Sequence, residues 1–90
     1  MDRKQRIEAR LREVFAPDAV DVDDDSARHA GHAGARAGGE THYRVRVVSA
    51  RFEGLSRVAR HRLVFDALKA EFAGGLHALN IEAVAPEPAP

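Results

Sequence analysis

Cysteine is absent from this sequence of 90 residues, and its absence excludes several kinds of chemistry. No disulfide framework can form, and the chain offers no redox-active thiol. The chain does contain five histidines, and neutral imidazole is the commonest metal-ligating side chain in proteins. It can therefore contribute nitrogen to a metal centre, whereas the thiolates of any thiolate-held cluster would have to come from a partner.

An excess of either charge is also absent, because 14 Lys and Arg residues balance 14 Asp and Glu residues. This balance argues against sequence-independent nucleic-acid binding, which depends on cations that neutralise phosphates, although it leaves room for a local basic face. No apolar run approaches the ~20 residues of a membrane-spanning helix, and no apolar run of signal-peptide length follows the charged amino terminus. We therefore expect a cytoplasmic protein that does not bind membranes.

Catalytic motifs are absent as well. The sequence has no phosphate-binding P-loop, no cysteine nucleophile, and no Ser, His and Asp in a recognisable catalytic context. We therefore do not expect an enzyme. The 90 residues are enough for one domain with a single hydrophobic core.

Two segments have the apolar spacing of amphipathic helices. In residues 7–15, apolar side chains recur every three to four positions, and the helix should end before Pro17. The second helix should begin after Ser56, a suitable N-cap, and should end at Gly74-Gly75. It spans about four turns, either unbroken or divided into two. Its apolar positions are Val58, Leu63, Val64, Phe65, Leu68 and Phe72.

Three segments with alternating apolar and polar residues predict β-strands. They are residues 19–23, 41–49 and 76–84. Because side chains alternate between the two faces of a strand, one face of each should be buried and the other exposed. In the second strand, Tyr43, Val45 and Val47 should share the buried face, opposite His42.

The stretch between the first two strands, residues 24–39, is rich in Gly and Ala. It cannot bury enough apolar area to order itself, so we expect a mobile loop. The element order is thus helix, strand, strand, helix or helix pair, and strand. We predict a single α+β domain over residues 1–85, with a three-stranded sheet backed by helices on one face. Residues 86–90, rich in Pro, should form a disordered tail.

Several short segments together resemble the BolA family, in which they occur in the same order and at the same spacing. They are Asp24-Asp25-Ser26, the His- and Gly-containing loop, Gly39-Glu40-Thr41-His42-Tyr43, Val47-Val48-Ser49, Arg51-Phe52-Glu53-Gly54, Arg60-His61-Arg62-Leu63-Val64 and Leu76-His77-Ala78-Leu79. The resemblance covers residues 7–85 and implies a fold similar to the type II KH domain, with a mixed sheet. It also implies a heterodimer with a monothiol glutaredoxin. In that complex the glutaredoxin and glutathione would supply thiolates to a shared 2Fe-2S cluster, and this chain would supply imidazole.

The resemblance implies two imidazole ligands from this chain. The ligand in the carboxyl-terminal motif is His77. The loop ligand is His32 or His29, because counting forward from Asp24 favours His29 and counting back from Thr41 favours His32. We prefer His32, since its glycine neighbours let the ring approach a cluster without crowding. The absence of a loop cysteine places the chain in a His-type subgroup of the family.

Each histidine also has a purely structural interpretation. By strict alternation, His77 shares the buried face of Leu79 and could be a partly buried core residue, although its position at the start of the strand favours exposure. The two loop histidines could simply be solvated. We expect His42 to be structural and hydrogen-bonded to nearby backbone. His61 lies between two arginines and could belong to a solvated basic helix face.

A DNA-binding transcriptional regulator is the alternative function. Arg57, Arg60 and Arg62 form a basic stretch of the second helix, and the turn before it resembles a helix-turn-helix element. Gly31-His32-Ala33-Gly34 matches the Gly-x-x-Gly letters of nucleic-acid-binding KH loops, but it lies between two strands rather than two helices. With zero net charge, the preferred function is a non-enzymatic adaptor in iron–sulfur maturation or iron sensing. The sequence leaves open a weak homodimer.

Overall fold

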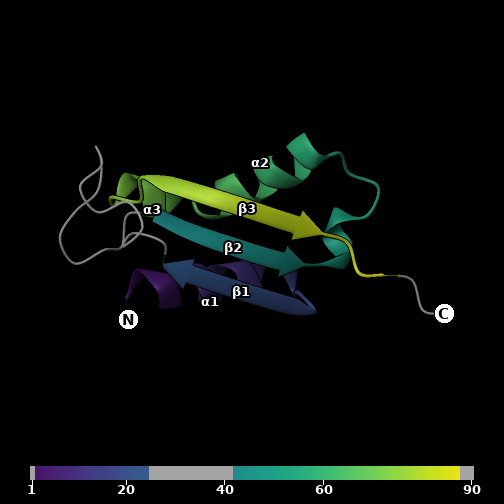
Figure 1. Ribbon diagram of the computed structural model, residues 1–90, viewed down its shortest axis with the longest axis horizontal. Coiled ribbons are helices and arrows are strands. Elements are labelled where there is room, and N and C mark those ends of the chain that lie inside the picture. Colours follow the sequence, from purple (N-terminus) through teal and green to yellow (C-terminus); the bar gives the residue numbers. More distant parts are fainter. Residues whose placement is uncertain (1, 25–41, 88–90) are drawn as a thin grey trace.

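The computed structural model of the chain describes residues 2–24 and 42–87. Its elements, in chain order, are α1 (Arg3–Phe15), β1 (Ala19–Asp24), β2 (His42–Val48), a short 3-10 helix (Ala50–Phe52), α2 (Arg57–Ala67), α3 (Lys69–Ala73) and β3 (Ala78–Val84). The strands form a three-stranded sheet in the order β1-β2-β3, and the helices lie behind it (Figure 1). β1 and β2 are antiparallel, whereas β2 and β3 are parallel. The predicted α+β fold with a mixed sheet is confirmed.

The predicted elements are all present, with shifts at their ends. The last strand begins at Ala78 rather than at Leu76, and the first helix begins at Arg3, a turn earlier than the apolar spacing indicates. Most of the predicted loop, residues 24–39, and the end of the predicted tail lie outside the described residues. The helices within the described ranges are too short or too polar to span a lipid bilayer.

Helix α1 begins early because Asp2 and Gln5 form a capping box. The Asp2 carboxylate accepts a hydrogen bond from the Gln5 backbone N–H (2.8 Å), and the Gln5 side-chain oxygen accepts one from the Asp2 N–H (2.9 Å). Such reciprocal bonds satisfy donors that a helix start would otherwise leave unpaired. The helix ends at Phe15. Its C-cap is Ala16, which has a left-handed backbone (φ 42°, ψ 55°) and precedes Pro17. The residue before a proline is disfavoured in the helical conformation, so the helix does not continue through Ala16.

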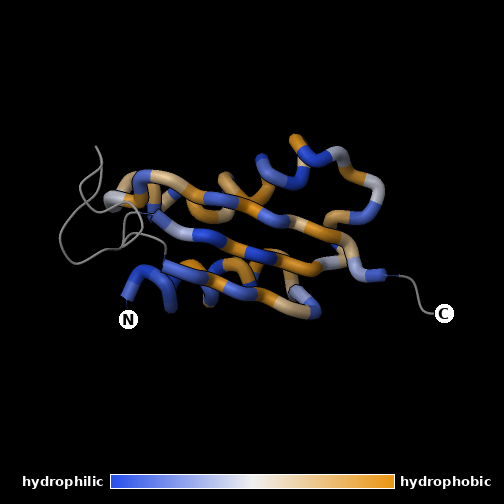
Figure 2. The backbone as a smooth tube through the Cα atoms, viewed as in Figure 1, coloured by the Kyte–Doolittle hydropathy of each residue, from blue (hydrophilic) through white to orange (hydrophobic). Residues whose placement is uncertain are grey.

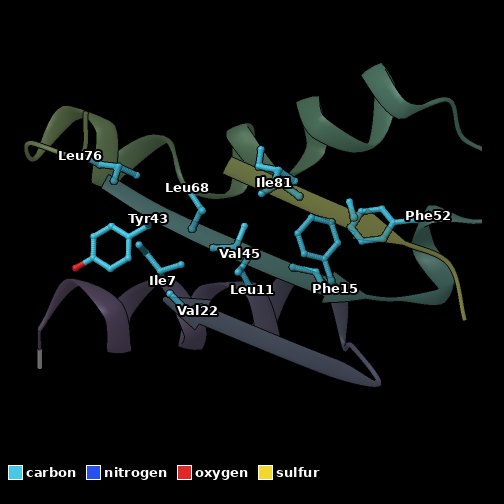
Figure 3. Close-up of a cluster of buried hydrophobic side chains, with 13 residues drawn as sticks. Ile7, Leu11, Phe15, Val22, Tyr43, Val45, Phe52, Leu68, Leu76 and Ile81 are labelled. Atoms are coloured by element: carbon cyan, nitrogen blue, oxygen red, sulfur yellow. The ribbon is translucent and has the colours of Figure 1, made fainter. Parts of the chain in front are cut away.

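The core lies between the sheet and the helices. Tyr43, Val45 and Val47 of β2 are buried as predicted, and Figure 2 shows hydrophilic and hydrophobic residues in alternation along the strands. Phe15 at the end of α1 packs against Phe52 of the 3-10 helix, with ring centroids 5.0 Å apart. Figure 3 shows the rings of Phe15 and Phe52 next to each other among the other core side chains. The buried core is Ile7, Leu11, Phe15, Val22, Tyr43, Val45, Val47, Phe52, Val64, Leu68, Leu76, Ile81 and Ala83.

The opposite face of the sheet carries charges of both signs. Arg44 and Arg46 project from the central strand β2, and both are exposed. Arg44 pairs with Asp23 of β1 (3.7 Å), and Arg46 pairs with Glu82 of β3 (3.2 Å). Opposite charges on neighbouring strands are favourable, although exposed pairs contribute little individually. This face is therefore compatible with water and needs no second layer.

The second predicted helix is divided into α2 and α3 at Leu68, one of the two arrangements that the sequence allowed. The Leu68 N–H donates to both Val64 O (3.1 Å) and Phe65 O (3.2 Å), a tightened turn that ends the regular helix. Val64 and Leu68 are buried, whereas Val58 is 60% exposed and Phe65 is 42% exposed. The core therefore covers only some of the apolar residues whose spacing predicted this helix pair.

An ion-pair cluster fastens the start of α1 to α3. Arg3 and Arg6 both donate to the carboxylate of Glu71, at 3.1 Å each, and Arg3 also donates to Gly74 O at 2.6 Å. Hydrogen bonding from Arg6 is the main cause of the lowered pKa of Glu71. Burial opposes this shift, and the hydrogen bond and charge of Arg3 add to it. The cluster fixes the turn that leads into β3.

Candidate functional site

His77 lies at the amino end of β3 and is exposed. The preceding Leu76 is buried, and its N–H donates to Glu71 O at 2.9 Å, so the backbone just before His77 is held in place. β3 begins at Ala78, and the strand alternation that would bury His77 therefore does not reach it. The interpretation of His77 as a core residue is wrong, whereas its expected exposure is confirmed.

The ring of His42 lies close to the ring of His77. Its ring centroid lies 5.3 Å from that of His77, and the ring planes are inclined by 49°. The cause is the parallel register, in which His42 at the start of β2 pairs with Ala78 at the start of β3. Unlike His77, His42 is buried, with 8% of its surface exposed. The structure thus joins two histidines that sequence reasoning had assigned separate roles.

The pair has a chemistry that each ring alone lacks. Imidazole nitrogens bind zinc-like ions at ~2.0–2.1 Å, and rings at this separation are close enough to approach one metal centre or to orient each other. Within residues 2–24 and 42–87, no group of three or more His, Cys, Asp or Glu is placed to hold a metal ion. The remaining ligands of a metal centre here would therefore come from outside these residues.

The loop histidines predicted as ligands, His29 and His32, lie outside the described residues. The residues that flank residues 25–41, however, are placed. Asp24 pairs with Tyr43 across β1 and β2, next to His42. The residues on both sides of this segment thus lie at the end of the sheet where His42 and His77 are found.

The three arginines of the basic stretch of α2 have different surroundings. The Arg60 guanidinium donates to Leu55 O (Nε, 3.0 Å) and to Ala83 O (Nη1, 3.2 Å), and so ties the turn before α2 to β3. Arg57 and Arg62 are exposed, and His61 is half-buried. Of the three arginines considered for DNA binding, Arg60 is therefore already occupied by backbone carbonyls.

The pairing of His42 with His77 was the feature that sequence reasoning missed. Each residue lies in a recognised segment, but no local pattern gives the register between two parallel strands. A signal existed in the position of each histidine at the first residue of its strand or just before it. Only the pairing of strand starts converts that signal into proximity.

Comparisons with known proteins agree with this fold. The family model described as BolA-like protein matches residues 11–88. The chain is 48% identical to an uncharacterized Sinorhizobium protein from the cobS 5' region, over 96% of this chain and 94% of that one. It is 48% identical to mouse BolA-like protein 1 over 89% of this chain, but spans only 56% of that protein. The solved BolA domain of SufE1 from Arabidopsis thaliana superposes with a TM-score of 0.86 and 44% identity, covering 96% of this chain and 94% of that domain.

Proposed function

The chain belongs to the BolA-like protein family, and from this premise we propose that it is a non-enzymatic adaptor. It pairs with a monothiol glutaredoxin and shares a 2Fe-2S cluster with it. The observation that carries the proposal is the exposed imidazole of His77, held at the start of β3 beside His42 with ring centroids 5.3 Å apart. In this proposal the adaptor acts in the cytoplasm, in iron–sulfur maturation or iron sensing.

The donor set of the chain suits a shared cluster better than a cluster of its own. The sequence has no cysteine, so the thiolates must come from the glutaredoxin and from bound glutathione. This chain would contribute the imidazole of His77, and of a loop histidine, to the shared cluster. Replacing thiolate by neutral imidazole makes the cluster less negative and raises its reduction potential, as in Rieske centres.

We assign different roles to the two described histidines. His77 is exposed and is the ligand, whereas His42 is buried and positions the His77 ring. Little order has to be gained at His77, because the peptide groups on both sides of it are already held by Glu71 and by the sheet. The sequence predicts a mobile loop at His32 and His29, and ordering a mobile loop costs ~1–2 kcal/mol for each backbone residue that becomes fixed. His77 should therefore contribute most to retention of the cluster.

The test is anaerobic reconstitution of the chain with a monothiol glutaredoxin and glutathione, followed by visible absorption and circular dichroism. The complex should show a 2Fe-2S spectrum, and the chain alone should remain colourless. His77→Ala should abolish or bleach the spectrum most strongly. His32→Ala should alter its shape and shorten its lifetime, and His29→Ala should do less.

His61→Ala is the matched control, because His61 lies on α2 beside residues 81–84 at the carboxyl end of β3, whereas both strand histidines lie at its amino end. It should leave the spectrum unchanged. An unaltered spectrum with His77→Ala would contradict the proposal. A larger loss with His29→Ala than with His32→Ala would change only the choice of loop ligand.

A further inference from the structure

Strand β3 has a backbone edge that no strand covers within the described part of the chain. It is the last strand in the order β1-β2-β3. Val84 O faces β2, because it accepts a hydrogen bond from Ser49 N (3.0 Å). Peptide groups alternate in direction along a strand, so the N–H and C=O groups of Leu79, Ile81 and Ala83 face outward. An uncovered edge of this kind can pair with another extended chain.

Helix α2 lies alongside this edge and makes it one wall of a groove. The groove encloses about 410 Å³ and is lined by Leu55, Arg57, Arg60 and His61 on one side and by residues 81–84 of β3 on the other. In Figure 1, α2 lies beyond β3 on the side away from β2. The groove is at the carboxyl end of β3, opposite the end that carries His77.

One contact already shows what the edge can bind. The Arg60 guanidinium donates to the outward-facing Ala83 O at 3.2 Å. A charged side chain over an edge strand is a known protection against unwanted pairing. Arg60 covers only Ala83, however. The outward N–H and C=O groups of Leu79 and Ile81 lie nearer the amino end of β3, away from this contact.

The charge of the groove selects among the chains that could pair there. Its helix side contributes the positive charges of Arg57 and Arg60. Its one acidic residue, Glu82, is paired with Arg46 at 3.2 Å on the outer face of the sheet. Leu55, which is 36% exposed, adds apolar surface to the groove. The surroundings of the free edge are therefore cationic and partly apolar.

We propose that this groove binds an extended acidic segment of a partner protein, which adds to the sheet as a fourth strand beside β3. Backbone hydrogen bonds to the outward peptide groups of β3 give the affinity, and carboxylates of the segment pair with Arg57. A single-stranded nucleic acid fits less well, because it has no ladder of alternating N–H and C=O groups. The proposal does not depend on the cluster, since it uses neither His77 nor His42.

The experiment titrates the full chain into a fluorescein-labelled octapeptide of alternating Val and Glu, followed by fluorescence anisotropy at physiological salt. Two further peptides carry N-methyl groups on either the odd or the even amides. Only one edge of an added strand faces β3, so one methylated peptide should lose at least about tenfold in affinity and the other should bind as the parent does. The peptide should also slow hydrogen exchange at the amide of Ile81.

Charge reversal on α2 supplies the matched pair of variants. Arg57→Glu, inside the groove, should weaken binding about tenfold, whereas Arg62→Glu, exposed on the same helix but outside the groove lining, should change it less than about twofold. Both side chains are exposed, and unchanged far-ultraviolet circular dichroism checks the fold of each variant.

Three outcomes would overturn the proposal. One is the absence of saturable binding to the parent peptide. Another is equal weakening by Arg57→Glu and Arg62→Glu, which would indicate general charge attraction. The third is tighter binding of an oligothymidylate of equal charge, lost with Arg57→Glu, which would assign the groove to nucleic acid. Glutaredoxin is absent from the titration, so its result is independent of the cluster proposal.

Discussion

Helices α1 and α2 pack on the same face of the sheet but differ in how much of their apolar surface the fold covers. Leu11 of α1 is fully buried and Phe15 is 2% exposed, whereas Val58 of α2 is 60% exposed and Phe65 is 42% exposed. Helix α1 also has a capping box and ion pairs to α3. Apolar spacing therefore identifies both helices but does not reveal which one the core depends on. We infer that α1 mainly stabilises the fold, while α2 leaves surface for other molecules.

The largest expected effect comes from truncating one apolar residue on each helix. Leu11→Ala should lower the free energy of unfolding by about 2–5 kcal/mol, because it removes buried apolar atoms and leaves a cavity. Val58→Ala should change it by less than about 0.5 kcal/mol, since that side chain is largely solvated. Urea unfolding followed by circular dichroism measures both. Similar losses would show that α2 is covered in solution in a way that the structure does not show.

A matched pair of serine substitutions tests the same contrast through hydrogen bonds. Ser49 is buried; its hydroxyl donates to Phe15 O at the end of α1 (2.7 Å) and accepts from Arg51 N (3.2 Å). Ser49→Ala should cost about 1–3 kcal/mol, because it leaves a buried carbonyl without its partner. Ser56→Ala removes only the exposed cap of α2, which accepts from Ala59 N, and should cost nearer ~0.5–1 kcal/mol. The reverse order in chemical denaturation would refute the contrast.

The ion pairs of α1 predict a pH dependence. The folded pKa of Glu71 lies below its ordinary value of 4.5, so its stabilising contribution is present above that pH. This contribution is lost as pH falls through the folded pKa. Glu71→Gln should therefore cost about 1–2 kcal/mol at pH 7, and the difference from the parent protein should shrink below about pH 4.5.

Glu71 lies on α3, and a control for it is available on the exposed side of α1. Glu8 pairs with Arg12 at 3.1 Å, with side chains 40% and 56% exposed. Glu8→Gln should cost only about 0.3–0.5 kcal/mol, because exposed pairs at this helical spacing contribute little. Thermal or urea unfolding from pH 3 to pH 7 distinguishes the two. A Glu71→Gln cost that did not change with pH would contradict the assigned ion pairing.

The last test concerns the two strand histidines in the absence of a partner. His42 is 8% exposed, and His42→Ala should lower stability by about 1–2 kcal/mol through lost packing. His77 is exposed, and His77→Ala should change it by less than about 0.5 kcal/mol. If His77→Ala were the more destabilising, His77 would have a structural role and its assignment as the ligand would weaken.

The sequence predicted the sheet best at β2, where one face of the strand is buried and the other is exposed. Tyr43, Val45 and Val47 alternate with exposed arginines, and a one-residue error of register would have placed them in water. Helix α2 was harder, because its apolar residues occupy more of the helix than the core covers. Only its contact with the sheet decides that Val64 is buried and Val58 is not.

Features that join distant segments could not be predicted from local patterns. The ion pair of Arg3 with Glu71 depends on how α1 and α3 pack. The sequence around each residue resembles that around other surface charges. The approach of His42 to His77 depends on parallel strand register. The resemblance to the family identified His77 as important, but His42 became interesting only through this contact.

The mixed charges on the open face of the sheet have a consequence for solubility. With zero net charge and a sequence pI near 7.0, copies of this protein have little overall repulsion at neutral pH. Faces bearing Asp23, Arg44, Arg46 and Glu82 can then attract one another, positive on negative. Such attraction weakens when ions shorten the Debye length to ~8 Å at 0.15 M. The protein should therefore dissolve better in moderate salt than in dilute buffer, the opposite of a protein that precipitates through apolar patches.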